Sequence, residues 1–429
     1  APLHTQPPAR VSPAGPLPRV VDTITLGQEP DVCAGSAVAV DPDTGYLHTA
    51  GLRDERSFDQ AQDRPFDEAQ GRPCLTVIDP ATDQVLETHE LPFEPRFLRW
   101  DRGTLYAIGR GDGTLIVANA NTGQVVAREL VGEDLDYQTE TQVVARDGWV
   151  YVSLPGDPTT GTGGVLYLIP LDGGPTRIIR DARAFDLADD GRFAVIGGET
   201  TTNVRVYAGT DGTLLAKREI GPGEPGVSLA FDGWSDRIFI SRRQAGGGDI
   251  PARYLVDVLD ATSLETVNQT EEAAWRLTAD PRRGRVYGYG SESRIISFDT
   301  ATGQPLGTVF SIPQADPSGL TTIRPAEKLH IDPTSGHITV IYEDFDGGTW
   351  VARFDPATGE GVADVQVPPG APWAEDADLQ RVYFGDRDFL LALAAATLQP
   401  VWRVSLSRAP VSAAIAPSRG LLFVGDAGG

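Results

Sequence analysis

A strand–turn–strand unit recurs along almost the whole chain, and this repetition limits the fold more than any other feature of the sequence. Nine runs rich in branched and aromatic residues break at a turn and resume as a second strand, and eight of these hairpins are followed by another hairpin. The turns share their chemistry, as DPDTG, ANTGQ, TATGQ and PATGE show. Glycine supplies the positive φ of a tight reversal, and the Asp, Asn or Thr before it bonds the turning backbone.

Two consecutive hairpins make a unit of four antiparallel strands, which we call A to D from first to last. The clearest unit runs from Ser36 to Leu91, and its strands read SAVAV, YLHTAG, CLTVID and VLETHEL. Units of this kind, repeated along the chain, are typical of β-propellers, in which the sheets stand radially as blades. We therefore predict an all-β fold, a single β-propeller of four-stranded antiparallel blades, with eight blades favoured and seven or nine as the alternatives.

The two ends of the repeat bear on how the ring closes. Residues 20–27 read as an outer strand with no A, B or C strand before it, and the last hairpin has no C or D strand after it. Closing a propeller removes exposed strand edges. Two interpretations follow: the sequence is truncated, or eight complete blades close the ring and both ends pack outside it, which we favour.

The predicted propeller spans residues 20–429 and follows an extended, proline-rich tether over residues 1–19. The chain contains no methionine, which together with this tether fits a mature bacterial protein exported to the periplasm, the cell surface or the medium. Residues 52–73 form an inserted loop that holds a tandem octapeptide duplication, RSFDQAQD followed by RPFDEAQG. A short duplication in the DNA, inserted in a surface loop that tolerates insertions, explains it. The alternative is a partner-binding arm that uses Phe58 and Phe66.

The chain is strongly acidic, with a formal charge of −24 and an isoelectric point near 4.5. Nucleic acids and anionic membranes bind basic surfaces, so neither is an expected partner. The chain has no run of about 18 apolar residues, so this segment is not expected to span a membrane. Solubility explains the acidity, and attraction of cations or of a basic partner is the alternative.

Cys33 and Cys74 are the only cysteines, and they bracket the first A–B hairpin and its inserted loop. In an exported protein the two can form a disulfide, and two separate buried thiols are the alternative. A cysteine metal site is not expected, because the chain has no CxxC motif and no cluster of Cys and His.

The predicted connections differ in length between the two faces of the ring. The A–B and C–D turns gather on one face, here called the short-turn face, whereas the B–C and D–A connections on the opposite, long-loop face hold nearly every long insertion. Because binding residues concentrate on long loops of a rigid scaffold, we predict partner contacts on the long-loop face. The candidates are Phe58, Phe66, Asp134, Asp136, Arg242, Arg243, Asp344 and Asp346.

Some of these loops are acidic, and Ca²⁺ takes about six to eight oxygen ligands. The run EDFDGG, residues 343–348, lacks the spacing of an EF-hand loop. Solvated loops are therefore the favoured interpretation, and a Ca²⁺ site is the alternative. No other cofactor and no defined metal site is predicted.

The chain carries no motif that predicts catalysis. GxSxG, HExxH, P-loop and CxxCH patterns are missing from the sequence, so no catalytic residue is assigned. Polar and aromatic residues on the predicted A strands could bind a small ligand at the mouth of the central channel. Packing of blade against blade is the favoured alternative for the same residues. They are Arg99, Asp186, Trp275, Arg276, His330, Trp373 and Glu375.

The runs SAVAVDPDTGYLHTAG, CLTVIDPATDQVLETHEL, GTLIVANANTGQVVAREL and SRIISFDTATGQPLGTV carry a family likeness. They resemble the YVTN-type β-propeller repeats of bacterial and archaeal envelope proteins, and the likeness extends over about positions 20 to 429. The tetrapeptide that names the family is replaced here by YLHT, LYAI and VYVS. Proteins with similar blades include surface-layer proteins, the heavy subunit of quinoprotein amine dehydrogenases and lactonase-like enzymes.

Two functions fit these observations. The first, which we favour, is an exported, non-catalytic scaffold that presents its long-loop face to a protein or glycan partner at the cell envelope. The second is a propeller enzyme or enzyme subunit, of the lactonase-like or quinoprotein dehydrogenase heavy-subunit kind, with a pocket at the channel mouth.

Overall fold

The computed structural model shows a chain folded almost entirely into β-strands. Within the described part, a short 3-10 turn, η4 (Pro281–Arg283), is the one helical element. The structure describes residues 34–41, 46–53, 72–79, 84–93, 95–111, 114–120, 122, 124–130, 142–154, 163–198, 201–209, 211–222, 228–244, 253–272, 274–290, 294–311, 329–331, 336–343, 349–359, 361–367, 373–376, 381–385, 389–394, 398, 400–405, 410–416 and 421–426.

These residues form eight four-stranded antiparallel sheets and one two-stranded sheet. In each four-stranded sheet the strands lie side by side in chain order, as two consecutive hairpins require. The first four sheets are built from β1 (Ala34–Val40), β2 (Leu47–Arg53), β3 (Arg72–Asp79) and β4 (Gln84–Glu90); β5 (Pro95–Asp101), β6 (Thr104–Gly111), β7 (Thr114–Asn119) and β8 (Val125–Leu130); β9 (Gln142–Arg146), β10 (Trp149–Leu154), β11 (Val165–Pro170) and β12 (Arg177–Arg180); and β13 (Ala184–Leu187), β14 (Phe193–Gly197), β15 (Thr201–Tyr207) and β16 (Leu214–Pro222).

The remaining sheets continue the same pattern, which confirms the prediction of four-stranded antiparallel blades. They are built from β17 (Ser228–Asp232), β18 (Arg237–Gln244), β19 (Arg253–Asp260) and β20 (Thr266–Thr270); β21 (Ala274–Asp280), β22 (Arg285–Gly290), β23 (Arg294–Asp299) and β24 (Pro305–Ser311); β25 (Leu329–Ile331), β26 (Ile338–Glu343), β27 (Thr349–Phe354) and β28 (Gly361–Val367); β29 (Trp373–Asp376), β30 (Arg381–Gly385), β31 (Phe389–Ala394) and β32 (Pro400–Ser405); and the hairpin β33 (Pro410–Ala416) and β34 (Leu421–Asp426).

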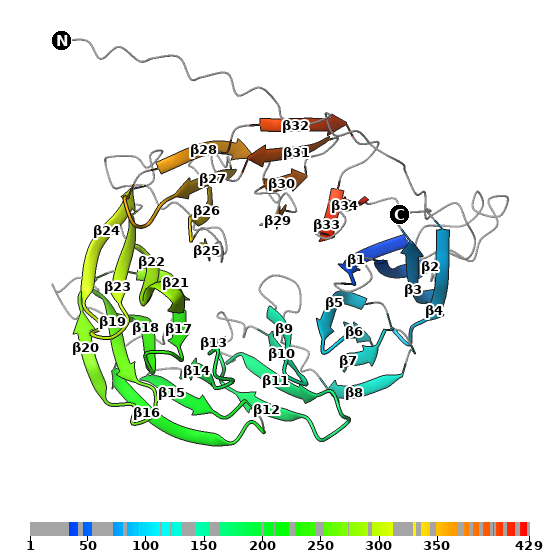
Figure 1. Cartoon of the computed structure of the whole chain (residues 1–429). Coiled ribbons are helices and arrows are strands. Elements are labelled where there is room, and N and C mark those ends of the chain that lie inside the picture. The colour runs from blue at the N-terminus through cyan, green and yellow to red at the C-terminus, as the bar shows by residue number, and fades with distance from the viewer. Residues whose placement is uncertain are drawn as a thin grey trace, which may run out of the picture.

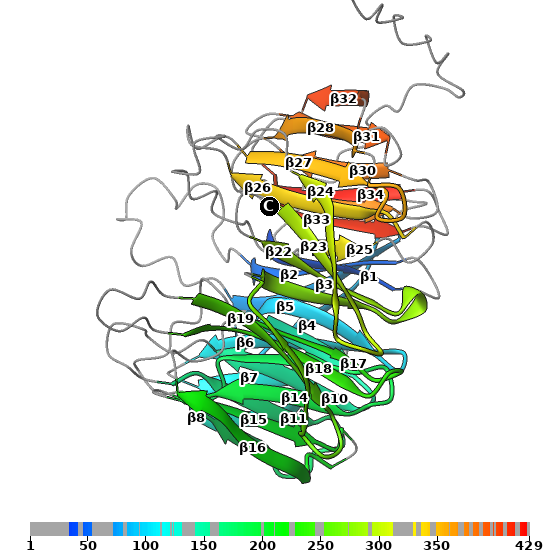
Figure 2. The ribbon, with the colours of Figure 1, turned by 90° about the vertical axis from the view of Figure 1, so that its left-hand side faces the viewer.

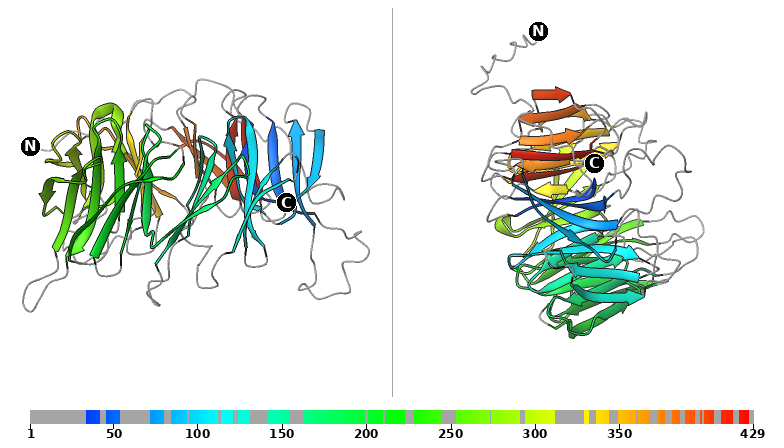
Figure 3. Two further views of the ribbon diagram at one scale, coloured as in Figure 1. Left: turned by 90° about the horizontal axis from the view of Figure 1, so that it is seen from below. Right: turned by 90° about the vertical axis from the view of Figure 1, so that its right-hand side faces the viewer.

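The sheets stand radially around a central axis, with the first strand of each four-stranded sheet nearest the axis and the last strand outermost (Figure 1). In the side views the strands run from one face of the ring to the other (Figure 2, Figure 3). This arrangement is that of a β-propeller. It puts strand A of every blade at the centre and strand D at the rim.

The hairpin of β33 and β34 differs from the expected position of the C-terminal segment. β33 contacts β29 of the eighth sheet and β1 of the first sheet, so the hairpin takes a place in the ring rather than packing outside it (Figure 1). The number of blades therefore stays a prediction. Residues 1–19 and 20–27 lie outside the described residues, as does most of the predicted insertion, since β2 ends at Arg53 and β3 begins at Arg72.

The core lies between neighbouring sheets. Strands β10 (WVYVSL) and β11 (VLYLIP) are buried along almost their whole length, whereas three of the four residues of β12 are exposed. Middle strands therefore have both side-chain faces covered, which explains their nearly continuous apolar sequence. Between the second and third sheets, for example, Ile108 and Val117 pack in one cluster with Val150 and Val152. Each sheet buries its apolar faces only when another sheet lies on either side.

The C–D turns show why the repeated turn motif needs its residues. In the sixth sheet Asp299 Oδ1 accepts hydrogen bonds from the backbone N–H and the hydroxyl of Thr302, both at 2.9 Å. Its other oxygen accepts from Arg285 Nη1 at 2.8 Å. The backbone bond from Thr302, together with the charge of Arg285, holds the pKa of Asp299 below its ordinary value despite an opposing effect of burial. Gly303 follows with φ +69°, which glycine adopts without strain.

A buried histidine lies between the first and second sheets. His48, on β2, is 4% exposed, and its ring meets that of Trp100 edge to face with centroids 5.3 Å apart. Neither ring nitrogen has a hydrogen-bond partner. Burial, only partly offset by the charge of Asp41, lowers the pKa of His48 from 6.5 to about 4.

We expect the fold to lose stability in mild acid because of His48. The unfolded chain takes up a proton near pH 6.5 and the folded chain does not until about pH 4, so this contribution is full above pH 6.5 and is lost as pH falls toward 4. Between pH 7.5 and 4.5 the wild-type free energy of unfolding should fall by about 2–3 kcal/mol more than that of His48→Leu. Urea unfolding at the two pH values measures this, and equal losses in both proteins would contradict it.

Candidate functional site

All seven residues predicted at the channel mouth lie on innermost strands. Arg99 is on β5, Asp186 on β13, Trp275 and Arg276 on β21, His330 on β25, and Trp373 and Glu375 on β29. The side chains of Trp275, His330, Trp373 and Glu375 lie outside the described part of the structure. Arg99, Asp186 and Arg276 are the three whose side chains the structure describes.

Arg99 and Asp186 each bond to the backbone of the next innermost strand. Arg99 Nε donates to the carbonyl oxygen of Val143, 3.1 Å away on β9. Asp186 Oδ2 accepts from the N–H of Phe231, 2.8 Å away on β17. Burial lowers the pKa of the Arg99 guanidinium below its ordinary value. Both side chains therefore serve blade-to-blade packing, the alternative favoured by the sequence.

Ser228 makes a third bond of this kind, which the sequence pattern did not indicate. Its Oγ accepts from the N–H of Leu277, 2.8 Å away on β21. The three bonds join residues 44, 45 and 49 positions apart in the chain, about one blade each. Because they link innermost strands across blade boundaries, they hold the second sheet against the third, the fourth against the fifth, and the fifth against the sixth.

Arg276 stands apart from these bridging residues. On β21, two residues, Arg276 and Leu277, face the single residue Gly288 of β22, so the strand carries a bulge here. Arg276 has φ +52°, in the left-handed region that a side chain with a Cβ seldom adopts. The bond to Ser228 fixes the bulge from one side. A Cβ at Gly288 would lie 2.8 Å both from the Ala274 Cβ and from the Leu277 side chain, so a larger residue there would require a shift.

The side chain of Arg276 is exposed. It is the third residue of β21, so it lies near the end of the strand that follows a D–A connection, on the side of the long-loop face. Strained non-glycine residues concentrate at binding and active sites, where the surrounding structure maintains them. Arg276 therefore combines exposure, charge and backbone strain on an innermost strand.

Most of the residues predicted on the long loops lie outside the described part of the chain. Phe58, Phe66, Asp134, Asp136, Asp344 and Asp346 lie outside the described residues, and of Arg243 only the position on β18 is described.

Arg242 corrects the prediction of a free partner-binding side chain. It is 6% exposed, and its Nε is bonded to Asp257, which is 3% exposed. Asp257 also accepts from Gln269 Nε2 at 2.5 Å. A buried pair of this kind depends on both partners, because removing one leaves the other charged and uncompensated. Arg242 therefore has a structural role within the fifth sheet.

Cys74 is disulfide-bonded and 1% exposed. Cys33 is the only other cysteine of the chain and lies outside the described residues.

A second polar arrangement, which the sequence did not indicate, links successive turns on the short-turn face. Asp101 Oδ2 accepts from the N–H of Gly148, 2.8 Å away in the A–B turn of the next sheet. Arg146 Nη2 donates to the carbonyl oxygen of Asp189 at 3.2 Å. Arg192 Nη1 reaches Asp236 Oδ1 at 2.7 Å. The second to fifth sheets are thus joined one to the next at their A–B turns.

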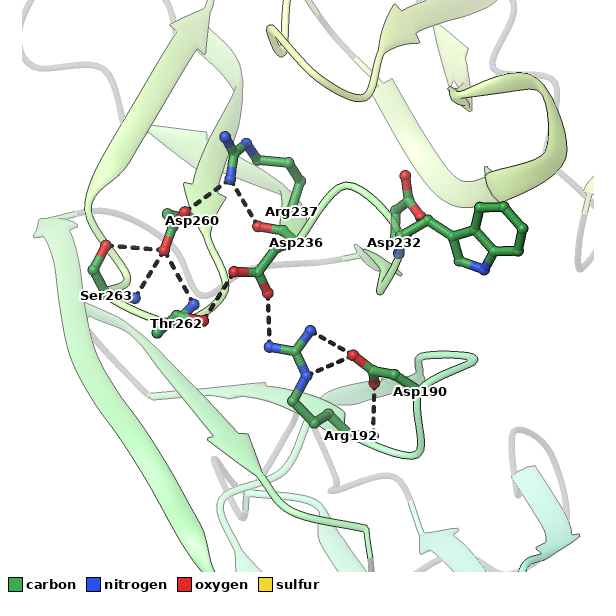
Figure 4. Close-up of polar contacts among 9 residues, drawn as sticks. Asp190, Arg192, Asp232, Asp236, Arg237, Asp260, Thr262 and Ser263 are labelled. Carbon is green, nitrogen blue, oxygen red and sulfur yellow. Dashed lines mark hydrogen bonds and ion pairs between the residues drawn. The ribbon is translucent and has the colours of Figure 1, made fainter.

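The link between the fourth and fifth sheets is the most extensive of these contacts (Figure 4). Arg192 pairs with Asp190 of its own turn as well as with Asp236. Asp236 Oδ2 in turn accepts from the hydroxyl of Thr262 at 2.9 Å. Burial opposes ionisation of Asp190, but hydrogen bonds and charge from Arg192 outweigh it and hold the pKa of Asp190 below its ordinary value.

Within the described residues, no group of three or more His, Cys, Asp or Glu side chains is arranged to hold a metal ion. The described residues also include no helix long and apolar enough to cross a membrane.

Comparison with solved structures supports the fold. A quinohemoprotein alcohol dehydrogenase from Pseudomonas putida HK5 aligns with a TM-score of 0.50 and 14% identity, over 76% of this chain and 68% of that one. A eukaryotic initiation factor aligns with a TM-score of 0.50 and 13% identity, over 87% and 88%.

No protein-family model and no curated protein matches the sequence. Structural likeness at these identities extends to the fold alone. The chain is a β-propeller protein, and membership of the YVTN-type family stays a prediction.

We expect Asp186→Ala to destabilise the ring. It removes the acceptor of the Phe231 N–H, and Phe231 is 2% exposed, so the free energy of unfolding should fall by about 1–3 kcal/mol. Glu265→Ala is the matched control, because it removes the same charge from an exposed turn residue. Urea unfolding of both variants measures the difference, and equal midpoints would show that the inter-blade bond does not contribute.

Proposed function

We propose that this chain is an exported, non-catalytic β-propeller scaffold that binds a protein or glycan partner at the cell envelope through its long-loop face. The observation that most supports this function is the exposed and strained position of Arg276 on an innermost strand. A guanidinium in this position can donate several hydrogen bonds to an acidic or hydroxylated group of the partner.

Rigidity of the ring supports the same proposal. Arg99, Asp186 and Ser228 bond the innermost strands to one another. A surface held in one geometry before association loses less conformational entropy when it binds. The arrangement therefore suits a scaffold that presents fixed contacts.

The alternative is a propeller enzyme or enzyme subunit, and a single purified sample separates the two. The scaffold function predicts no quinone absorbance, no stoichiometric metal and no hydrolysis of a lactone panel by the intact chain. Steady turnover of any lactone, or a bound quinone, would contradict the scaffold function and support the enzyme function.

Arg276→Gly should stabilise the fold while weakening partner binding. Glycine removes the strain of φ +52°, so the free energy of unfolding should rise by up to about 1 kcal/mol. Arg276→Ala keeps the strain and loses the guanidinium. Both variants should retain less partner from an envelope extract of the source organism than the wild type does.

The control for this experiment is Arg177→Ala, which removes an exposed arginine from an outermost strand. Immobilised proteins are compared for the polypeptides and glycans that they retain, and chemical unfolding gives the stabilities. If Arg276→Ala retains the partner as well as the wild type and the control do, Arg276 is not part of the binding surface.

A further inference from the structure

The exposed large apolar side chains of the described residues gather at one face of the ring. Seven of the eight lie within the first three residues of an outermost strand, directly after a C–D turn, and the eighth lies in an A–B turn. Both kinds of turn belong to the short-turn face. The eight are Val85, Leu86, Ile178, Leu214, Leu215, Trp234, Val267 and Leu306.

Trp234 is the most exposed of them, at 75%. It lies in the turn between β17 and β18, and that turn is fixed by its neighbours. Asp232, 1% exposed, accepts from the Trp234 N–H at 3.0 Å and from the Ser235 hydroxyl at 2.6 Å. A Cβ added to Gly233 would lie 3.0 Å from Ala188 of the fourth sheet, so the turn packs closely against its neighbour.

The far end of the same turn is fixed as well. Asp236 is bonded to Arg192 of the fourth sheet and to Thr262 of the following C–D turn (Figure 4). The indole is therefore presented from a backbone that is anchored on both sides. Tryptophan is one of the residue types most enriched among the hot spots of protein interfaces.

The polar cluster that anchors the Trp234 turn is negative. The cluster in Figure 4 contains the four carboxylates of Asp190, Asp232, Asp236 and Asp260 but only the two guanidiniums of Arg192 and Arg237, which leaves a formal charge of −2. Both arginines already pair with carboxylates of the cluster. Asp232, two residues before Trp234, bonds to an N–H and a hydroxyl of its own turn. The whole chain, at −24, adds a field of the same sign.

We propose that the short-turn face between the fourth and fifth sheets binds a basic segment of a partner protein, with an arginine of that segment stacked on the indole of Trp234. A cation is attracted to the face of an aromatic ring, most strongly to tryptophan, and the net negative charge of the cluster favours it further. Because the turn is rigid before binding, ordering it costs little. This surface is separate from the one around Arg276, so the two proposals stand or fall independently.

The test measures binding of fluorescein-labelled hexa-arginine and hexa-lysine to the intact chain by anisotropy, at about 150 mM NaCl to screen long-range attraction. Hexa-arginine should bind more tightly, because guanidinium stacks on aromatic faces better than ammonium does. Trp234→Ala should weaken hexa-arginine binding about five- to tenfold. Trp234→Phe should weaken it less, because an aromatic face remains.

Two variants serve as controls. Leu306→Ala removes a 52% exposed side chain from the same face outside the cluster, and Arg276→Ala changes the other proposed surface. Both should leave hexa-arginine binding unchanged. Equal binding of the two peptides with no effect of Trp234→Ala would show attraction to net charge alone and overturn the proposal. Binding of the uncharged glycan maltoheptaose through Trp234, with no peptide binding, would also overturn it.

Discussion

The architecture depends on the burial of the middle strands on both faces. Strands such as β10 and β11 are apolar along almost their whole length, so a single sheet would expose one apolar face to water unless another sheet covered each side. Burying apolar area is the main favourable contribution to folding, at about 25 cal/mol per Å². A ring satisfies this requirement for every sheet at once, and the polar links at its centre and turns then position the second to sixth sheets against one another.

The parts of this architecture that the sequence predicted are those encoded within one blade. The four-strand repeat is readable because strands, turns and their order are local, and Asp299, Thr302 and Gly303 perform the turn chemistry that their types imply. The placement of the seven channel-mouth candidates on innermost strands follows from the same local pattern.

Properties that depend on contacts between side chains of different strands or different blades were not readable from the sequence. The burial of Arg242 depends on Asp257 and Gln269 from two neighbouring strands, and nothing beside Arg242 in the sequence distinguishes it from a solvent-facing arginine. The bulge at Arg276 depends on Ser228 in the preceding blade and on close packing at Gly288. The position of the C-terminal hairpin depends on contacts with β1, at the opposite end of the described chain.

Every four-stranded sheet is made from one continuous stretch of chain, in sequence order. Hydrogen-bonded partners within a blade are therefore close along the polypeptide, which keeps contact order low for an all-β protein and reduces the loop entropy lost before pairing begins. A chain emerging from a ribosome or a translocation channel can complete one blade before the next is available. Assembly can thus proceed vectorially, and wrong strand pairing between distant blades has fewer opportunities to occur.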